Sequence, residues 1–248
     1  MRVAALYDIH GNLPALEAVL EDVRRAVVDR IVVGGDVLPG PMPRETLAYL
    51  LALEIPTQFI RGNGDREVLS RMAGIDTGTI PERFRPVMQW VADELEPEHE
   101  RVMSRWPATL DLEIPGVGDV LFCHATPRND TEIFTRLTPE DRVRRALAGV
   151  QASLVVCGHT HMQFDRMVDD TRVVNAGSVG MPFGEAAAYW LLLGPDVELR
   201  RTAYNLEQAA ARIRATDYPQ AEEFAARDVL SPPSEQEILE RYSRVELI

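Results

Sequence analysis

The fold is decided by one stretch near the N-terminus, Val3-Ala4-Ala5-Leu6-Tyr7-Asp8-Ile9-His10-Gly11-Asn12. Its first half is a continuous apolar run, which predicts a short buried β-strand. Asp8, His10 and Asn12 follow at once in a polar loop, and asparagine is a residue type that caps helices. Leucine and valine then recur at helical spacing from Leu13 to Val23. The stretch therefore predicts a strand, a polar loop and an amphipathic helix.

Four further apolar runs end in the same way, with polar residues directly after a predicted strand. The polar residues that follow them are Gly35-Asp36, Gly62-Asn63, His124 and Gly158-His159-Thr160-His161. In open α/β sheets the binding crevice lies at the carboxyl ends of the strands, so we expect these side chains to converge. Together with the first stretch, these motifs contain four of the five histidines, and histidine is the commonest metal ligand. The pattern predicts two metal ions that share a bridging carboxylate.

The composition is that of an ordinary globular protein, with 248 residues of which 46% are hydrophobic and 26% charged. The formal net charge of -13 disfavours non-specific binding to nucleic acid or to an anionic membrane. Small anionic substrates stay possible because bound metal ions invert the local field. No uncharged apolar run approaches the ~20 residues of a membrane helix, and Asp8 comes too early for a signal peptide. We therefore expect a cytoplasmic protein that does not bind membranes.

We expect one domain over residues 1–248, with two segments that depart from the strand–helix rhythm. The sequence predicts a helical insertion or cap over residues 66–107. A packing role and a substrate-covering role are equally good interpretations of this segment. Residues 205–248 read as a charged, helical C-terminal extension.

The five motifs together resemble those of the calcineurin-like metallophosphoesterase superfamily, over roughly residues 1 to 205. The loops Asp8-Ile9-His10-Gly11-Asn12, His124-Ala125-Thr126-Pro127-Arg128 and Asn175-Ala176-Gly177-Ser178-Val179-Gly180 resemble its small bacterial and archaeal phosphodiesterase branch. The resemblance implies an α/β fold, namely a four-layered α/β/β/α sandwich of two mixed sheets.

The resemblance also implies the ligands of two divalent transition-metal ions. Asp8, His10, Asp36 and His161 would hold one ion, while Asp36, Asn63, His124 and His159 would hold the other, with Asp36 as the bridge. Oxygen and nitrogen ligands without thiolate suit manganese, our first expectation, as well as iron, zinc, cobalt or nickel. The implied reaction is phosphoester hydrolysis by a metal-bridging hydroxide. Asp36, Asn63, His124 and Arg128 are the expected catalytic residues.

The chain departs from the family pattern at Gly64, where many relatives carry a histidine that stabilises the transition state or protonates the leaving oxygen. Loss of a general acid typically costs ~10²–10⁴-fold in rate, so we expect poor leaving groups to be handled badly. Asp65 could assist, but a helix N-cap is the better interpretation. Arg128 is either a phosphate clamp or half of a surface salt bridge. Asn12 either orients His10 or contacts substrate, or it only caps a helix.

The leading hypothesis is a phosphodiesterase whose partner is a small-molecule phosphoester. A phosphomonoesterase or a dinucleoside polyphosphate hydrolase would use the same chemistry, and a protein phosphatase fits least because of Gly64. A metal-free protein-binding scaffold of the same fold is the alternative of another class. It is disfavoured because a buried cluster of ligands without metal leaves polar groups unpaired. The sequence does not specify an oligomeric state.

Overall fold

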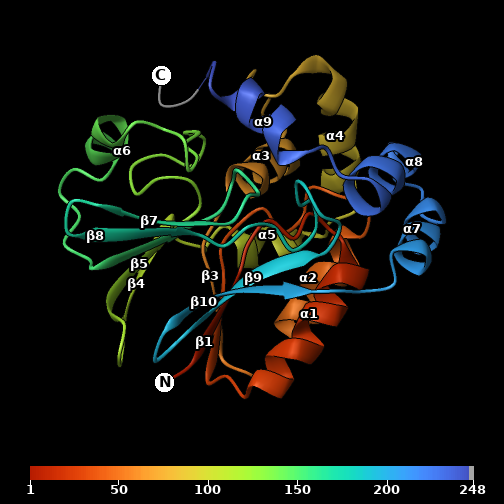
Figure 1. Ribbon diagram of the computed structural model, residues 1–248. Coiled ribbons are helices and arrows are strands. Elements are labelled where there is room, and N and C mark those ends of the chain that lie inside the picture. The colour runs from red at the N-terminus through yellow and green to blue at the C-terminus, as the bar shows by residue number, and fades with distance from the viewer. Residues whose placement is uncertain (246–248) are drawn as a thin grey trace.

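Two five-stranded mixed sheets lie face to face in the protein (Figure 1). The structure is a computed structural model that describes residues 1–245, so the last three residues of the predicted extension lie outside the described residues. The first sheet has the order β10-β9-β1-β2-β3. Its strands are β1 (Val3–Leu6), β2 (Arg30–Val33), β3 (Thr57–Phe59), β9 (Ala188–Leu193) and β10 (Val197–Thr202). β1, β2 and β3 are parallel, and β9 runs antiparallel to β1.

The second sheet has the order β4-β5-β6-β8-β7. Its strands are β4 (Thr109–Ile114), β5 (Gly118–Cys123), β6 (Leu154–Cys157), β7 (Phe164–Val168) and β8 (Thr171–Asn175). β5, β6 and β8 are parallel, while β4 and β7 are antiparallel edge strands. In each sheet the parallel strands therefore end at a common edge, as the polar motifs require.

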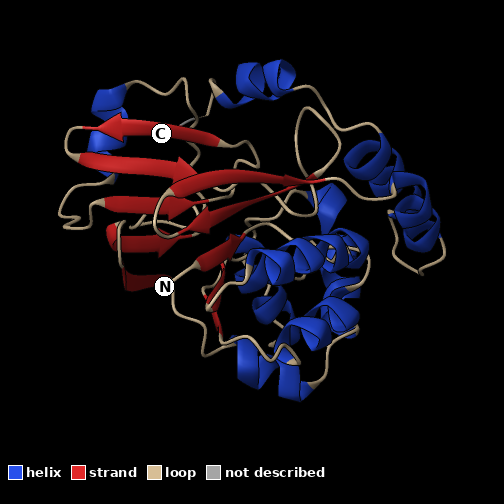
Figure 2. Ribbon diagram, turned by 60° about the horizontal axis from the view of Figure 1, so that its bottom comes forward, coloured by secondary structure: helices blue, strands red, loops and turns tan. Residues whose placement is uncertain are grey.

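Successive side chains along a strand face opposite sides of the sheet, and this alternation builds the layers. Val3 and Ala5 of β1 face the second sheet and pack in one core with Val156. Ala4 and Leu6 face the other way and pack against the helices. A further core lies between the outer face of the second sheet and α6 (Glu140–Ala146). The result is the predicted α/β/β/α sandwich, and Figure 2 shows most of the helices gathered on one side of the strands.

The helices of the larger layer come from three parts of the chain. α1 (Leu13–Ala26) and α2 (Pro43–Leu51) connect the first three strands. α3 (Asn63–Met72), η1 (Glu82–Phe84), α4 (Arg85–Asp93) and α5 (Pro97–Met103) precede β4. The C-terminal segment forms α7 (Leu206–Arg214), α8 (Ala221–Phe224), the π-helical turn η2 (Ala225–Leu230) and α9 (Glu235–Tyr242).

The segment expected as an insertion, residues 66–107, packs into the main core. Its apolar side chains Val68, Val91 and Met103 are fully buried in the same cluster as the strands and α1. The first helix of this segment begins three residues before it, at Asn63. The three buried side chains therefore pack in the core, and substrate covering by the segment stays a prediction.

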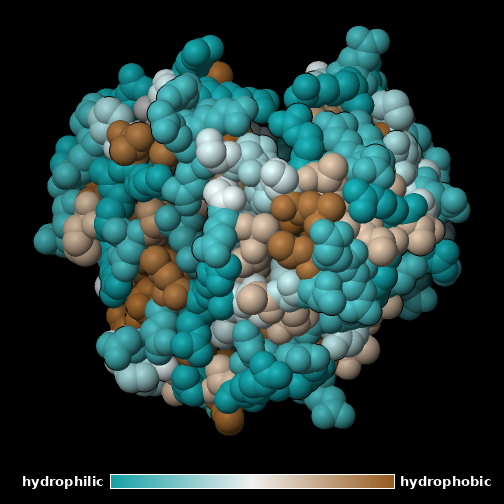
Figure 3. Space-filling view, turned by 45° about the vertical axis from the view of Figure 1, so that its right-hand side comes forward, coloured by the Kyte–Doolittle hydropathy of each residue, from teal (hydrophilic) through white to brown (hydrophobic). Residues whose placement is uncertain are grey.

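The two free cysteines, Cys123 and Cys157, are buried as small apolar residues. No helix within residues 1–245 combines the length and the apolar character that a membrane crossing requires. The face drawn in Figure 3 is mostly hydrophilic, with separate apolar patches.

Candidate metal centre

Tight turns after the strands carry most of the predicted metal ligands. Asp8, His10, Asp36, His159 and His161 all have φ between 50° and 64°. A left-handed backbone is uncommon for residues other than glycine and costs roughly 1–3 kcal/mol, and such residues cluster at functional sites. The structure thus concentrates strained backbone at the ends of β1, β2 and β6.

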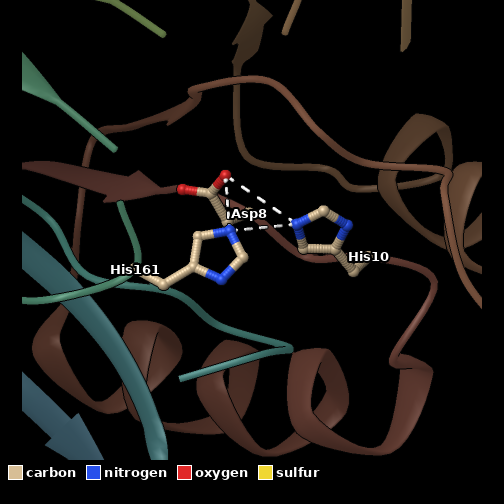
Figure 4. A group of neighbouring side chains, drawn as sticks. All are labelled: Asp8, His10 and His161. Atoms are coloured by element: carbon tan, nitrogen blue, oxygen red, sulfur yellow. Dashed lines mark hydrogen bonds and ion pairs between the residues drawn. The ribbon is translucent and has the colours of Figure 1, made fainter. Parts of the chain in front are cut away.

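Asp8, His10 and His161 form the first group of side chains. Their ligand atoms lie within 4.8 Å of one another, and all three residues are buried. Asp8 Oδ1 lies 3.3 Å from His161 Nε2 and 3.9 Å from His10 Nε2. Figure 4 shows the two imidazoles turned toward this same carboxylate oxygen.

Asp36, His124 and His159 form the second group, again with ligand atoms within 4.8 Å of one another. Asn63 joins this group, because its Oδ1 lies 3.1 Å from His124 Nε2. In this orientation the amide oxygen faces only acceptor atoms, whereas a rotated amide would donate to both His124 and His159. A cation held between oxygen and nitrogen lone pairs would favour the oxygen orientation. The structure thus brings all seven predicted ligands to one place.

The two carboxylates link the groups. Asp36 Oδ2 lies 3.5 Å from His124 Nε2 and 4.0 Å from His10 Nε2, so it faces an imidazole of each group. Asp8 Oδ1 also lies 3.9 Å from His124 Nε2. This Oδ1 atom is buried and has no hydrogen-bond partner. A buried, unpaired carboxylate oxygen is costly, and a cation bound beside it would remove that cost.

Backbone carbonyls orient three of the imidazoles. The Nδ1 atoms of His10, His124 and His161 lie 3.1, 2.9 and 2.7 Å from the carbonyl oxygens of Pro39, Gly34 and Met181. A carbonyl oxygen only accepts, so each Nδ1 donates its hydrogen and the neutral ring presents the lone pair of Nε2 to the centre. Carbonyl groups that fix the tautomer in this way are typical of metal-bound histidines. The residues present therefore fit a pair of divalent metal ions.

Charge coupling within the cluster is strong. Burial alone would raise the pKa of Asp36, but the imidazoles, His124 foremost, hold it well below its usual range. Burial alone would lower the pKa of His124, yet Asp36 and Asp8 raise it to about 10. Burial and the charge of His124 lower the pKa of His159 to about 4. Because metal ions bind neutral imidazole, they would compete with the proton on His124.

Gly64 has no room for a side chain. A Cβ atom there would lie 2.5 Å from Pro39 Cγ and 3.0 Å from Asp36 Oδ1. The Gly64 N–H donates to Asp36 Oδ1 over 2.7 Å. The departure from the family pattern is thus a packing requirement of this chain.

Asp65 is not the N-cap that the sequence predicts, because α3 begins two residues earlier at Asn63. Its fully buried carboxylate accepts hydrogen bonds from the N–H groups of Val37 (2.9 Å), Leu38 (3.3 Å) and Gly62 (3.1 Å). Burial and the charge of Asp36 raise its pKa to about 7. Asp65 therefore ties the loop that carries Asp36 to the start of α3.

The two predicted substrate contacts make hydrogen bonds to other parts of the chain. Arg128 donates to Glu132, with 2.6 Å between its Nη2 and Glu132 Oε1, and to the carbonyl oxygen of Arg145. It lines a pocket of about 620 Å³ that contains none of the predicted metal ligands. Asn12 caps α1 through Ala15 N–H and donates to the carbonyl oxygen of Gly180. Substrate contact by either residue stays a prediction.

Sequence reasoning missed several residues that shape the centre. The carbonyl groups of Gly34, Pro39 and Met181 carry no side-chain signal. Phe183 stacks on His161 with 5.4 Å between ring centroids, and no motif marks it. Ser178, in one of the loops that carry the family resemblance, donates to the Asp8 carbonyl oxygen over 2.7 Å.

Known proteins resemble this chain in sequence and in fold. The model of the calcineurin-like phosphoesterase superfamily domain matches residues 1–194. An uncharacterized protein of Methanocaldococcus jannaschii is 26% identical over 241 residues, which cover 88% of this chain and 94% of that protein. A metallophosphoesterase from Sphaerobacter thermophilus superposes with a TM-score of 0.72 at 25% identity, covering 91% of this chain and 97% of the other.

A hypothetical protein from Pyrococcus horikoshii superposes with a TM-score of 0.79, covering 94% of this chain and 99% of the other. At 22% identity it shows a shared fold alone. The family match spans most of the chain and contains all seven predicted ligands. The chain therefore belongs to the calcineurin-like phosphoesterase superfamily and is a metal-dependent phosphoesterase.

Proposed function

We propose that this phosphoesterase is a phosphodiesterase that acts on a small-molecule substrate with two divalent transition-metal ions. One observation carries the proposal: two groups of ligands, Asp8–His10–His161 and Asp36–His124–His159, lie side by side, and a histidine of each group faces the carboxylate of the other. Asn63 adds a neutral amide oxygen to the second group.

The ligand types define what the centre would hold. Asp8, His10 and His161 would bind one ion, His124, His159 and Asn63 the other, and Asp36 would bind both. Bound there, divalent ions would lower the pKa of water and neutralise charge on the transferring phosphoryl group. Oxygen and nitrogen ligands are compatible with manganese, which we propose, and with iron, zinc, cobalt or nickel.

The protein's own groups contribute position and charge. The carbonyl groups of Gly34, Pro39 and Met181 hold three imidazoles in one tautomer. Only two of the seven ligands are anionic, so two divalent ions would leave the centre positive. A positive centre attracts a phosphodiester anion although the whole chain carries a net charge of -13.

Position 64 bears on the choice of substrate. Without a side chain there, no imidazole can donate a proton to the leaving oxygen from α3. Removing a general acid costs most when the leaving group is a strong base. This favours phosphodiesters with acidic leaving groups over alkyl phosphomonoesters.

A substrate panel tests the proposal. Protein loaded with Mn²⁺ should hydrolyse bis(p-nitrophenyl) phosphate with a kcat/KM at least ~10²-fold above that for glycerol 3-phosphate, in line with the worth of a general acid. p-Nitrophenyl phosphate separates the effect of the leaving group from that of the second ester. Removal of metal by a chelator should abolish turnover, and Mn²⁺ should restore it.

Asp36→Asn should lose nearly all turnover. The matched control is Asp169→Asn, an exposed aspartate with the same left-handed backbone that pairs with Arg144. A clear preference for glycerol 3-phosphate would contradict the proposed diesterase activity. Parent-level turnover by Asp36→Asn would contradict the site.

A further inference from the structure

The last helix of the C-terminal segment packs beside one of the metal ligands. Ile238 and Leu239 of α9 form a small core with Met162, the residue that follows His161. α9 lies beyond residue 194, where the match to the family ends. A part of the chain outside the family match therefore reaches the metal centre.

Phe183 connects α9 to the ligand itself. Its half-buried ring stacks on the His161 imidazole, with 5.4 Å between the centroids and 21° between the planes. On its other contact, Phe183 meets the ring of Tyr242, the last residue of α9, edge to face at 6.4 Å between centroids. Stacked and edge-to-face pairs are the arrangements that aromatic rings prefer. The three rings therefore form a continuous path from α9 to the ligand.

The loop that carries Phe183 also holds the polar side of the first ligand group. The Met181 carbonyl oxygen lies 2.7 Å from His161 Nδ1 and accepts its hydrogen. The Ser178 hydroxyl accepts from the Met181 N–H over 2.8 Å and donates to the Asp8 carbonyl oxygen over 2.7 Å. The loop thus fixes the edge of the His161 ring through a carbonyl group, while Phe183 covers its face.

Two polar contacts hold the start of α9 against neighbouring loops. The N–H of Gly184, directly after Phe183, donates to the Pro233 carbonyl oxygen over 2.8 Å. Glu235, in the first turn of α9, pairs with Arg136 at 2.5 Å. Partly exposed ion pairs such as this one contribute little to stability. We therefore assign the connection between α9 and the centre to the aromatic contacts.

His161 needs support from its surroundings because its backbone is left-handed, with a φ of 57°. Such conformations persist only where the surrounding structure holds them. The second ligand group is supported from other parts of the chain. The Gly34 carbonyl oxygen orients His124, and Asp65 holds the loop that carries Asp36. A disturbance of α9 should therefore reach the first group and spare the second.

We propose that Phe183, held by α9, is a positioning residue for His161, so that the C-terminal segment sets the affinity for the first metal ion. This is the ion that Asp8, His10 and His161 would hold. The coupling is reciprocal, as binding equilibria require. An ion that fixes the His161 ring gives Phe183 and α9 a firmer surface to pack on. This inference rests on the two-ion centre of the proposed function.

Variants that keep only one ligand group test the proposal by Mn²⁺ titration. In a His124→Ala protein, which keeps the first group, Phe183→Ala should weaken Mn²⁺ binding by ~10–100-fold, the usual loss when the support of a metal ligand is removed. In a His161→Ala protein, which keeps the second group, Phe183→Ala should leave Mn²⁺ binding unchanged. The pair of titrations assigns the effect to one ion.

Matched variants separate positioning from general packing. Phe183→Tyr keeps the ring and should bind Mn²⁺ as the parent does. Phe224→Ala removes a more buried ring of the same segment, which meets the edge of Tyr218 at 6.1 Å, and should leave both ions unaffected. Tyr242→Ala removes the support behind Phe183 and should also weaken the first ion. It keeps the inference testable if Phe183→Ala does not fold.

Hydrogen exchange measures the reciprocal effect without reference to activity. Mn²⁺ should slow amide exchange over Glu235–Tyr242 in the parent and in His124→Ala. It should change exchange there little in Phe183→Ala or His161→Ala, because the path from the first ion to α9 is broken. A role in packing alone predicts the same exchange in α9 with and without Mn²⁺.

The inference is overturned if Phe183→Ala weakens both ions equally or weakens neither. It is also overturned if Phe224→Ala reproduces the loss, if Phe183→Tyr does not recover it, or if exchange in α9 does not respond to Mn²⁺. Turnover of bis(p-nitrophenyl) phosphate by the parent would keep the proposed function standing in each of these cases. Failure of the parent on every diester would instead overturn the proposed function, whatever the Phe183 variants do to Mn²⁺ binding.

Discussion

At the scale of single residues, the centre depends on main-chain groups as well as on its ligand side chains. Gly64 lets its N–H reach Asp36 Oδ1, and it does so against the ring of Pro39. Pro39 in turn orients His10 through its carbonyl oxygen. The absence of a histidine at position 64 and the orientation of His10 therefore both follow from how the loop after β2 packs on α3.

The packing of Gly64 against Pro39 is open to a paired substitution. Gly64→Ala should lower the free energy of unfolding by ~1–3 kcal/mol, because the new methyl group overpacks a filled site. Adding Pro39→Ala, which removes the Cγ atom in the way, should recover part of that loss. Urea unfolding of the single and double variants measures both changes. Additive losses, without recovery, would show that the two residues do not clash.

At the scale of elements, the first turn of α3 holds the loop that follows β2. Asp65 is the central connection, with its three backbone donors drawn from both elements. This places Asn63 and Asp36, which lie far apart in the sequence, beside His124 at the end of β5. The first turn of α3 thus holds together the residues that follow β2 and β5.

Loss of the Asp65 hydrogen bonds should lower the free energy of unfolding. Asp65→Ala would leave three N–H groups without an acceptor, and each unsatisfied buried group costs ~1–3 kcal/mol. We expect a lower free energy of unfolding and weaker Mn²⁺ binding, because Asp36 loses its support. Asp65→Asn keeps the shape and one acceptor oxygen, so it should lose less. Urea unfolding and Mn²⁺ titration check the order, and an Asp65→Ala protein as stable as the parent would contradict it.

At the scale of the whole molecule, much of the arrangement could be predicted from the sequence. Each polar motif follows an apolar run, and parallel strands end at one edge, so convergence of Asp8, Asp36 and His161 follows from the fold class. The role of residues 66–107 could not be predicted from the sequence. An amphipathic helix has the same pattern whether it packs on a core or belongs to a substrate-covering cap. The packing of α9 on Met162, beside His161, leaves no trace in the sequence, because it depends on how the C-terminal segment folds back over the sheet.

The central claim is that two groups of ligands each hold one metal ion, and metal analysis tests it most directly. Protein purified without chelator and titrated with Mn²⁺ should bind about two equivalents, as expected of a two-metal site. His161→Ala and His124→Ala should each keep about one equivalent, since each removes a ligand from a different group. A parent protein that holds less than about one equivalent and takes up none on titration would contradict the account.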